Sequence, residues 1–190
     1  MNCAVSKEKL RITFLEKRLE LSEEDHNEKS FDIANHCLKL PIWNLEYFHL
    51  FLPIKIKAEI DTSLILTILQ GRDKQVIVPK VNRTNLQHIL LTDSTKIITN
   101  SWGIPEPNDG ILIDPKQLDV IFIPLLGYDK KGNRVGYGKG FYDAFLANCK
   151  PRVIKVGLSF FEAVNQIDGI RPEDAPLNYC VTPQGVVNFS

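Results

Sequence analysis

The chain has little that would attach it to a membrane, a nucleic acid or a structural metal. No apolar run approaches the about 20 residues that span a bilayer. The 23 basic and 23 acidic side chains cancel, so no net field attracts nucleic acid or an anionic membrane surface. The four cysteines include no Cys-x-x-Cys pair, which disfavours a zinc site and a disulfide scaffold: Cys3, Cys37, Cys149 and Cys180. We therefore expect a reduced, cytoplasmic protein with neither a nucleic-acid nor a membrane partner.

The length and composition predict one ordinary globular unit. The 190 residues suffice for a hydrophobic core, and no linker, repeat or low-complexity segment divides them. We therefore expect a single domain over residues 1–190, acting as a monomer.

The pattern of apolar residues predicts helices alternating with strands. Two helices are expected to begin at the caps Ser6 and Ser22 and to end at about residues 19 and 37. A third is expected over 64–70, capped by Thr62 and ended by Gly71, and a fourth over 141–149. Strands are expected over 47–52, 76–79, 87–91, 120–124, 152–158 and 186–189, with loops over 101–110 and 168–183. Strands separated by helices predict an α/β fold with a largely parallel sheet.

The most informative segment is Arg-Val-Gly-Tyr-Gly-Lys-Gly-Phe-Tyr-Asp at residues 134–143. Its glycines, Gly136, Gly138 and Gly140, recur every second residue and are accompanied by the cations Arg134 and Lys139. Backbone N–H groups without a neighbouring Cβ can approach an oxyanion, and a following helix adds positive potential. The spacing fits neither a Walker loop nor a dinucleotide fingerprint, and a simple turn is the alternative interpretation. We favour a site for phosphate or nucleotide.

Three separated segments resemble the 5-formyltetrahydrofolate cyclo-ligase family (5,10-methenyltetrahydrofolate synthetases). They are the basic opening helix at 7–22, the Ser-Trp-Gly-Ile-Pro-Glu-Pro loop at 101–107, and the segment 124–143, which is similar to the family signature almost throughout. A weaker similarity covers 174–182. The resemblance implies a three-layer α/β/α fold with a mostly parallel Rossmann-like sheet, similar to the sugar-phosphate isomerase and CoA-transferase type.

The resemblance also implies a reaction. The family converts 5-formyltetrahydrofolate to 5,10-methenyltetrahydrofolate with ATP and Mg²⁺, releasing ADP and phosphate. Phosphorylation of the formyl oxygen makes it a good leaving group, and the substrate's own N10 then closes the ring. Since ring closure is intramolecular, the protein mainly has to align ATP with the formyl oxygen and neutralise charge.

By resemblance, one set of residues contacts ATP, with Arg134 and Lys139 in the catalytic role. The set is Lys7, Arg11, Arg134, Gly136, Gly138, Lys139, Gly140, Phe141 and Tyr142. Lys7 and Arg11 are four residues apart and so share one helix face, although a solvated basic face is the ordinary interpretation of such a pair.

The resemblance further implies a Mg²⁺ site and a folate site. Asp143 and Asp174 are the expected metal contacts, although the segment before Asp174 departs from the family pattern at Gly169 and Glu173. The expected folate contacts are Ile54, Glu59, Trp102 and Tyr142. Taken singly, each of these side chains also fits an ordinary packing, loop or helix-cap role.

Two other functions are consistent with the same residues. One is a folate- or nucleotide-binding relative that has lost phosphoryl transfer, which the altered segment before Asp174 would suit. The other is a sugar-phosphate isomerase on a similar scaffold, which would need an acid–base residue beside the glycines, where only Asp143 is available.

Overall fold

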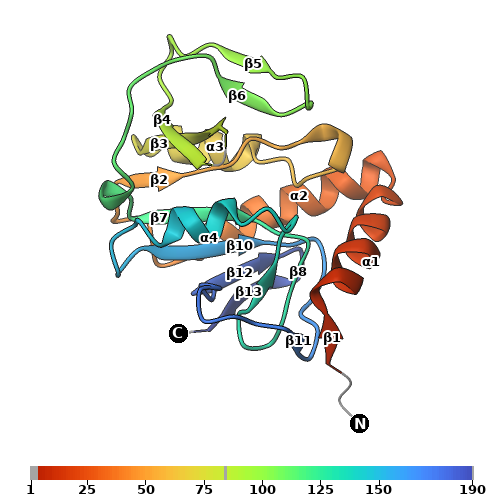
Figure 1. The fold of residues 1–190 in the computed structure, drawn as a ribbon. Helices are drawn as coiled ribbons and strands as arrows, with labels where there is room; N and C mark the ends of the chain where they lie inside the picture. The colour runs from red at the N-terminus through yellow and green to blue at the C-terminus, as the bar shows by residue number, and fades with distance from the viewer. Residues whose placement is uncertain (1–3, 84, 190) are drawn as a thin grey trace.

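The computed structural model describes residues 4–83 and 85–189, so Cys3 lies outside it (Figure 1). The helices are α1 (Lys7–Leu19), α2 (Glu23–Cys37), α3 (Ser63–Gln70) and α4 (Phe141–Leu146), with short 3-10 turns η1 (Lys55–Lys57) and η2 (Pro115–Gln117). None of the helices in this part of the chain is long and apolar enough to cross a membrane.

The main sheet has seven strands in the order β13-β12-β10-β7-β2-β3-β4. In chain order these are β2 (Tyr47–His49), β3 (Gln75–Asn82), β4 (Asn85–Leu90), β7 (Val120–Pro124), β10 (Ile154–Leu158), β12 (Tyr179–Thr182) and β13 (Gly185–Asn188). The five inner strands are parallel and the two edge strands are antiparallel. From β2 the chain proceeds toward β3, and from β7 it proceeds the other way toward β10. The gap between β2 and β7 is therefore a topological switch point.

The strand β7 shows why the sheet needs a layer on both faces. Val120 and Phe122 belong to the hydrophobic cluster beneath α2 and α3, while Ile121 and Ile123 belong to the cluster beneath α4. All four side chains are buried, and successive residues of a strand point to opposite faces. The α/β prediction with a mostly parallel sheet is confirmed, and helices lie on both faces of the sheet (Figure 1).

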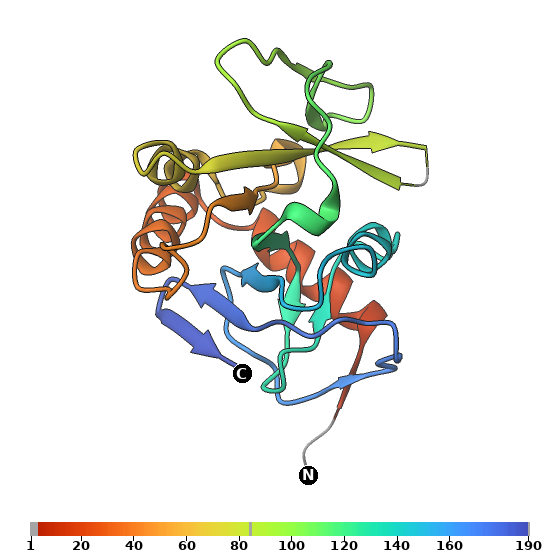
Figure 2. The same ribbon diagram turned by 90° about the vertical axis from the view of Figure 1, so that its left-hand side faces the viewer.

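Three two-stranded ribbons supplement the main sheet. They are β1 (Val5–Ser6) with β11 (Ile167–Asp168), β5 (Ile97–Thr99) with β6 (Pro105–Pro107), and β8 (Gly127–Tyr128) with β9 (Arg134–Val135). Figures 1 and 2 both show the β5–β6 ribbon projecting beyond the β3–β4 edge of the sheet.

The helix α1 is fixed to the β8–β9 ribbon by a small apolar cluster of its own. Ser6 caps the helix as predicted, its side chain accepting a hydrogen bond from the Lys9 amide. Leu10 and Phe14, one turn apart, pack against the ribbon and against the loop before it. Gly127 permits this approach, because a Cβ there would lie 3.2 Å from the Phe14 ring. The packing sets where the polar face of α1 points.

The predicted helix ends agree with the structure in part. Thr62 and Gly71 flank α3 as predicted, and Gly71 has ordinary helical conformation, with φ −64°. The Thr62 side chain does not cap the helix: its hydroxyl donates to the Phe51 carbonyl, and the Asp61 carboxylate accepts from the Ser63 amide. The helix predicted over 141–149 ends at Leu146, while Ser22 caps α2 as predicted.

The predicted loops were partly wrong. The segment 168–183 contains β12, an inner strand whose residues Cys180, Val181 and Thr182 are buried. The segment 101–110 contains β6, in which two prolines flank a glutamate. Both strands are short. The partner of β12 in the parallel ladder lies about 20 residues earlier, and β6 pairs with the nearby β5 but contains two prolines, so local pattern gives little sign of either strand.

A buried carboxylate organises the turn before the glycine segment. Asp129 is completely buried and accepts hydrogen bonds from the Lys131, Asn133 and Ile167 amides and from the Asn133 side chain. Four donors replace the water that the charge loses. Asp129 thereby ties β11 to the turn that leads into Arg134.

We predict that Asp129→Ala lowers the free energy of unfolding by about 3 kcal/mol, because several buried donors lose their acceptor. Chemical denaturation measures the change. The exposed Asp93 supplies the control, and Asp93→Ala should leave stability unchanged. Equal stability of Asp129→Ala and wild type would show that these bonds contribute nothing net.

Candidate active site

One pocket of about 680 Å³ lies at the switch point of the sheet. The loops that follow β2 and β7 form its floor, the start of α1 closes one side, and residues beside β6 form its opposite rim. In parallel α/β sheets ligands bind beyond the carboxyl ends of strands at this location. Every residue that the sequence predicts for ATP, metal or folate lines this pocket.

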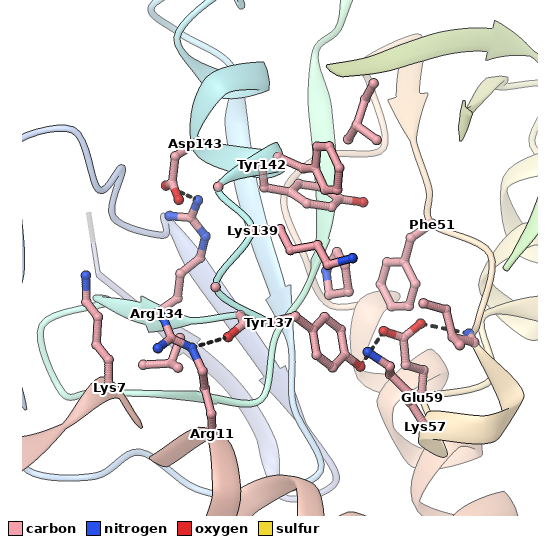
Figure 3. Close-up of a pocket in the computed structure, with 18 of the residues that line it drawn as sticks. Lys7, Arg11, Phe51, Lys57, Glu59, Arg134, Tyr137, Lys139, Tyr142 and Asp143 are labelled. Atoms are coloured by element: carbon pink, nitrogen blue, oxygen red, sulfur yellow. Dashed lines mark hydrogen bonds and ion pairs between the residues drawn. The ribbon is translucent and has the colours of Figure 1, made fainter. Parts of the chain in front are cut away.

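Lys7, Arg11 and Arg134 gather at one end of the pocket, and Lys139 extends from the glycine segment toward its middle (Figure 3). Lys7 and Arg11 come from the polar face of α1, and Arg134 and Lys139 come from the glycine segment. Arg11 donates through Nε to the Gly136 carbonyl over 3.0 Å, which joins the helix to the glycine segment. The four positive groups thus come from two segments more than 100 residues apart in sequence.

Two of these cations are paired with the two predicted metal ligands. Arg134 contacts Asp143 over 2.6 Å, and the same guanidinium donates to the Ala175 carbonyl. Lys7 forms an ion pair with Asp174. Partial burial alone would raise the pKa of Asp174, but the Lys7 ammonium and other donors outweigh it, so the pKa lies below its usual value.

The glycine segment needs glycine for two separate reasons. Gly138 and Gly140 have φ of +85° and +73°, a region that other residues rarely adopt. A Cβ on Gly138 would also lie 3.1 Å from the Arg11 guanidinium carbon. Gly136 has ordinary φ and nothing within 4 Å of an added Cβ, so open space faces it.

The other end of the pocket is apolar around one buried carboxylate. Glu59 is 4% exposed and follows η1; one oxygen accepts from the Ile54 amide at 2.8 Å and the other from the Tyr137 hydroxyl at 2.7 Å. Phe51 and Leu86 belong to the surrounding wall. Burial raises the pKa of Glu59 most strongly, and the two hydrogen bonds oppose that rise.

The aromatic residues predicted to contact folate differ in their positions. Trp102 is 62% exposed at the rim, and the Lys139 ammonium lies 5.6 Å from its ring centroid. Tyr142 instead packs edge-on against Phe145 and His49. Its hydroxyl is buried and has no hydrogen-bond partner in the described residues. Trp102 is thus accessible for stacking, whereas the Tyr142 ring is largely committed to packing.

The histidines beside Tyr142 behave as apolar core. Burial lowers the pKa of His49 far below its usual value and the pKa of His88 to about 4. The His88 ring stacks on Phe145 with 4.0 Å between centroids. Both imidazoles are therefore neutral at physiological pH, and both pack against Phe145 of α4.

The donor set suits Mg²⁺ only together with a phosphate ligand. The described residues contain no cluster of three or more His, Cys, Asp or Glu side chains that would hold a metal. Mg²⁺ usually keeps several waters and takes one or two carboxylates plus phosphate oxygens. Asp143 and Asp174 line the same pocket as the cations, so the residues fit a metal that arrives with a nucleotide.

Sequence reasoning missed the residues that hold Glu59. Arg18 and Tyr137 lie in segments quoted for the resemblance, yet the pattern gave neither a role at the site. Arg18 is 4% exposed and donates to the Tyr137 hydroxyl, and Lys57 lies 4.0 Å from the Tyr137 ring centroid. The only local sign was Arg18 itself, a basic residue seven positions after Arg11 and therefore on the same helix face.

Comparison with known proteins identifies the family of this chain. A sequence profile of the 5-formyltetrahydrofolate cyclo-ligase family matches residues 3–183. The 5-formyltetrahydrofolate cyclo-ligase of Haemophilus influenzae is 28% identical over 179 residues, which cover 90% of this chain and 94% of that protein. The relatives carry ligase names, which favours the ligase hypothesis over the isomerase alternative.

Solved structures give the same result for the fold. The NMR structure of Aquifex aeolicus 5,10-methenyltetrahydrofolate synthetase superposes with a TM-score of 0.79 at 28% identity, covering 96% of this chain and 92% of that one. The Mycoplasma pneumoniae synthetase, at 22% identity and a TM-score of 0.71, covers 93% and 98% and supports the fold. The family profile spans nearly the whole sequence, and the chain therefore belongs to the 5-formyltetrahydrofolate cyclo-ligase family and is a ligase.

Proposed function

We propose that this enzyme converts 5-formyltetrahydrofolate and ATP to 5,10-methenyltetrahydrofolate, ADP and phosphate, with Mg²⁺. The observation that carries the proposal is the division of the pocket. A group of cations and bare backbone amides occupies one end, and apolar walls around a buried carboxylate, with Lys57 beside it, occupy the other. A triphosphate suits the first end and a flat, hydrogen-bonding ring suits the second.

At the phosphate end, we infer an exchange of ion-pair partners on binding. Arg134 and Lys7 are now paired with Asp143 and Asp174. An incoming triphosphate supplies new anions for the cations, and its metal supplies a new cation for the carboxylates. Lys139 forms no ion pair among the described residues and is already available for a phosphate.

At the folate end, Glu59 can accept hydrogen bonds from the N–H edge of the pterin. An ionised carboxylate has about four lone-pair sites, of which the Ile54 amide and the Tyr137 hydroxyl use two. The exposed Trp102 ring at the rim provides a surface on which a flat ring can stack.

The chemistry then needs alignment rather than a protein nucleophile. The formyl oxygen attacks the γ-phosphorus and ADP leaves; N10 attacks the activated carbon, phosphate departs with the oxygen, and the N10 proton is lost. Arg134 and Lys139 stabilise the charge on the moving phosphoryl group. Asp143 and Asp174 would hold Mg²⁺, which would supply positive charge against the developing negative charge of the phosphates.

We also propose that the protein is a single cytoplasmic domain that acts as a monomer.

The purified protein should form the absorbing methenyl product from 5-formyltetrahydrofolate and Mg-ATP, with one ADP released per product. Absorbance measures the methenyl product, and chromatography of the same reaction mixture measures the ADP released. Omitting ATP is the control. Protein that binds the folate yet forms no product would instead be the non-catalytic binder, and the proposal would be wrong.

Gly138→Ala should abolish measurable ATP binding, because the added Cβ strains the backbone and displaces the Arg11 guanidinium. Calorimetric titration with ATP checks this. Gly185→Ala is the matched control, since Gly185 also has positive φ, +147°, but lies outside the pocket. It should keep full ATP affinity; unchanged affinity in Gly138→Ala would contradict the role of the glycine segment.

Asp143→Asn should raise the Mg²⁺ concentration that gives half-maximal rate, because a neutral amide is a poorer metal ligand than a carboxylate and removes the ion-pair partner of Arg134. Rates at varied Mg²⁺ and saturating ATP measure this. Glu173→Gln makes the same charge change at an exposed side chain and should have no effect. A fully active Asp143→Asn with unaltered Mg²⁺ dependence would remove Asp143 from the metal site.

A further inference from the structure

Two opposite charges are buried close to each other without forming an ion pair. Arg18 and Glu59 are each 4% exposed, and no ion pair among the described residues includes either of them. The Tyr137 hydroxyl lies between them: Arg18 donates to it, and it donates to Glu59 over 2.7 Å. A single hydroxyl therefore connects the cation to the carboxylate.

These two hydrogen bonds connect three parts of the structure around the site. Arg18 lies at the end of α1, Tyr137 lies between two glycines of the 134–143 segment, and Glu59 follows η1. Figure 3 shows the Tyr137 side chain directed at Glu59, with Lys57 beside it. The residue between the phosphate-facing glycines thus reaches the opposite, folate end of the pocket.

Only a hydroxyl satisfies both neighbours at once. A tyrosine hydroxyl accepts one hydrogen bond while donating another, and each bond polarises the next. Phenylalanine would leave a buried guanidinium and a buried carboxylate oxygen each short of a partner, an arrangement that proteins avoid.

We propose that Tyr137 is a positioning residue for Glu59, connecting it to Arg18 and holding its carboxylate directed toward the folate. The inference rests on the proposed function for the identity of the ligand. It assigns to Tyr137 a role in folate binding rather than in phosphate binding, although Tyr137 lies within the phosphate-binding segment.

The groups around Glu59 give the expected direction with pH. Burial raises the pKa of Glu59; the Tyr137 and Ile54 bonds lower it, followed by the charges of Arg18 and Lys57. Removing the Tyr137 bond therefore raises the pKa further, and Glu59 is protonated at a higher pH. The titratable and charged groups facing Glu59 are Arg18 from α1, His26 from α2, Lys57 from η1, Tyr137 and, from α4, Tyr142.

In Tyr137→Phe, the KM for 5-formyltetrahydrofolate should rise about tenfold, the factor expected for one lost hydrogen bond to a charged group. The KM for ATP should change little, and the acidic limb of kcat/KM should move to higher pH. Steady-state rates across the acid and neutral range measure all three. Tyr179→Phe, a tyrosine change outside the pocket, should match wild type.

A double-mutant cycle tests whether Tyr137 acts through Glu59. Glu59→Gln should lose the acidic limb, and adding Tyr137→Phe to it should change the pH profile no further. A difluorotyrosine at position 137 keeps the shape of tyrosine, but its hydroxyl is a stronger hydrogen-bond donor. It should move the acidic limb of kcat/KM to lower pH, and it tests the proposal even where Tyr137→Phe folds poorly.

Wild-type folate KM and pH profile in both Tyr137 variants would overturn the proposal. Should the wild-type protein make no methenyl product, the proposed function fails separately. Calorimetric binding of 5-formyltetrahydrofolate to the same variants at several pH values then decides whether Tyr137 controls Glu59.

Discussion

The site depends on the attachment of α1 to the segment that carries the glycines. Leu10 and Phe14 fix the helix to the β8–β9 ribbon, and the Arg11 guanidinium bonds to the Gly136 carbonyl. Without this contact the sheet would still present a switch point between β2 and β7, but half of its cations would be missing. The apolar packing of one helix face therefore decides the electrostatics of the pocket on the other.

The same helix also reaches the end of the pocket where Glu59 is buried, because Arg18 donates to the Tyr137 hydroxyl. Three of the charged groups in and around this pocket have partners of opposite charge: Arg134 pairs with Asp143, Lys7 pairs with Asp174, and Arg18 is connected to Glu59 through Tyr137. With a net charge of zero for the chain, the attraction for a triphosphate that we propose has to be local and geometric. Unliganded ion pairs of this kind keep the site assembled and can be exchanged for ligand charges.

The sequence predicted what depends on local pattern. The strand at 120–124, the caps Ser6 and Ser22 and the glycine segment all follow from neighbouring residues, and the segment's specificity led to the family. It could not predict features set by distant partners. The inner strand β12 pairs with residues about 20 positions earlier, and Tyr142 is directed into the core by His49, which lies more than 90 positions away. The burial of Arg18 could be recognised only in the folded structure.

The most direct test of the account is a structure of the protein with a non-hydrolysable ATP analogue and 5-formyltetrahydrofolate bound. We predict that the triphosphate oxygens lie on the amides between Gly136 and Gly140, that Lys7 and Arg11 are turned toward them, and that the pterin edge contacts Glu59. A nucleotide bound away from that segment, or a folate that leaves Glu59 untouched, would contradict it.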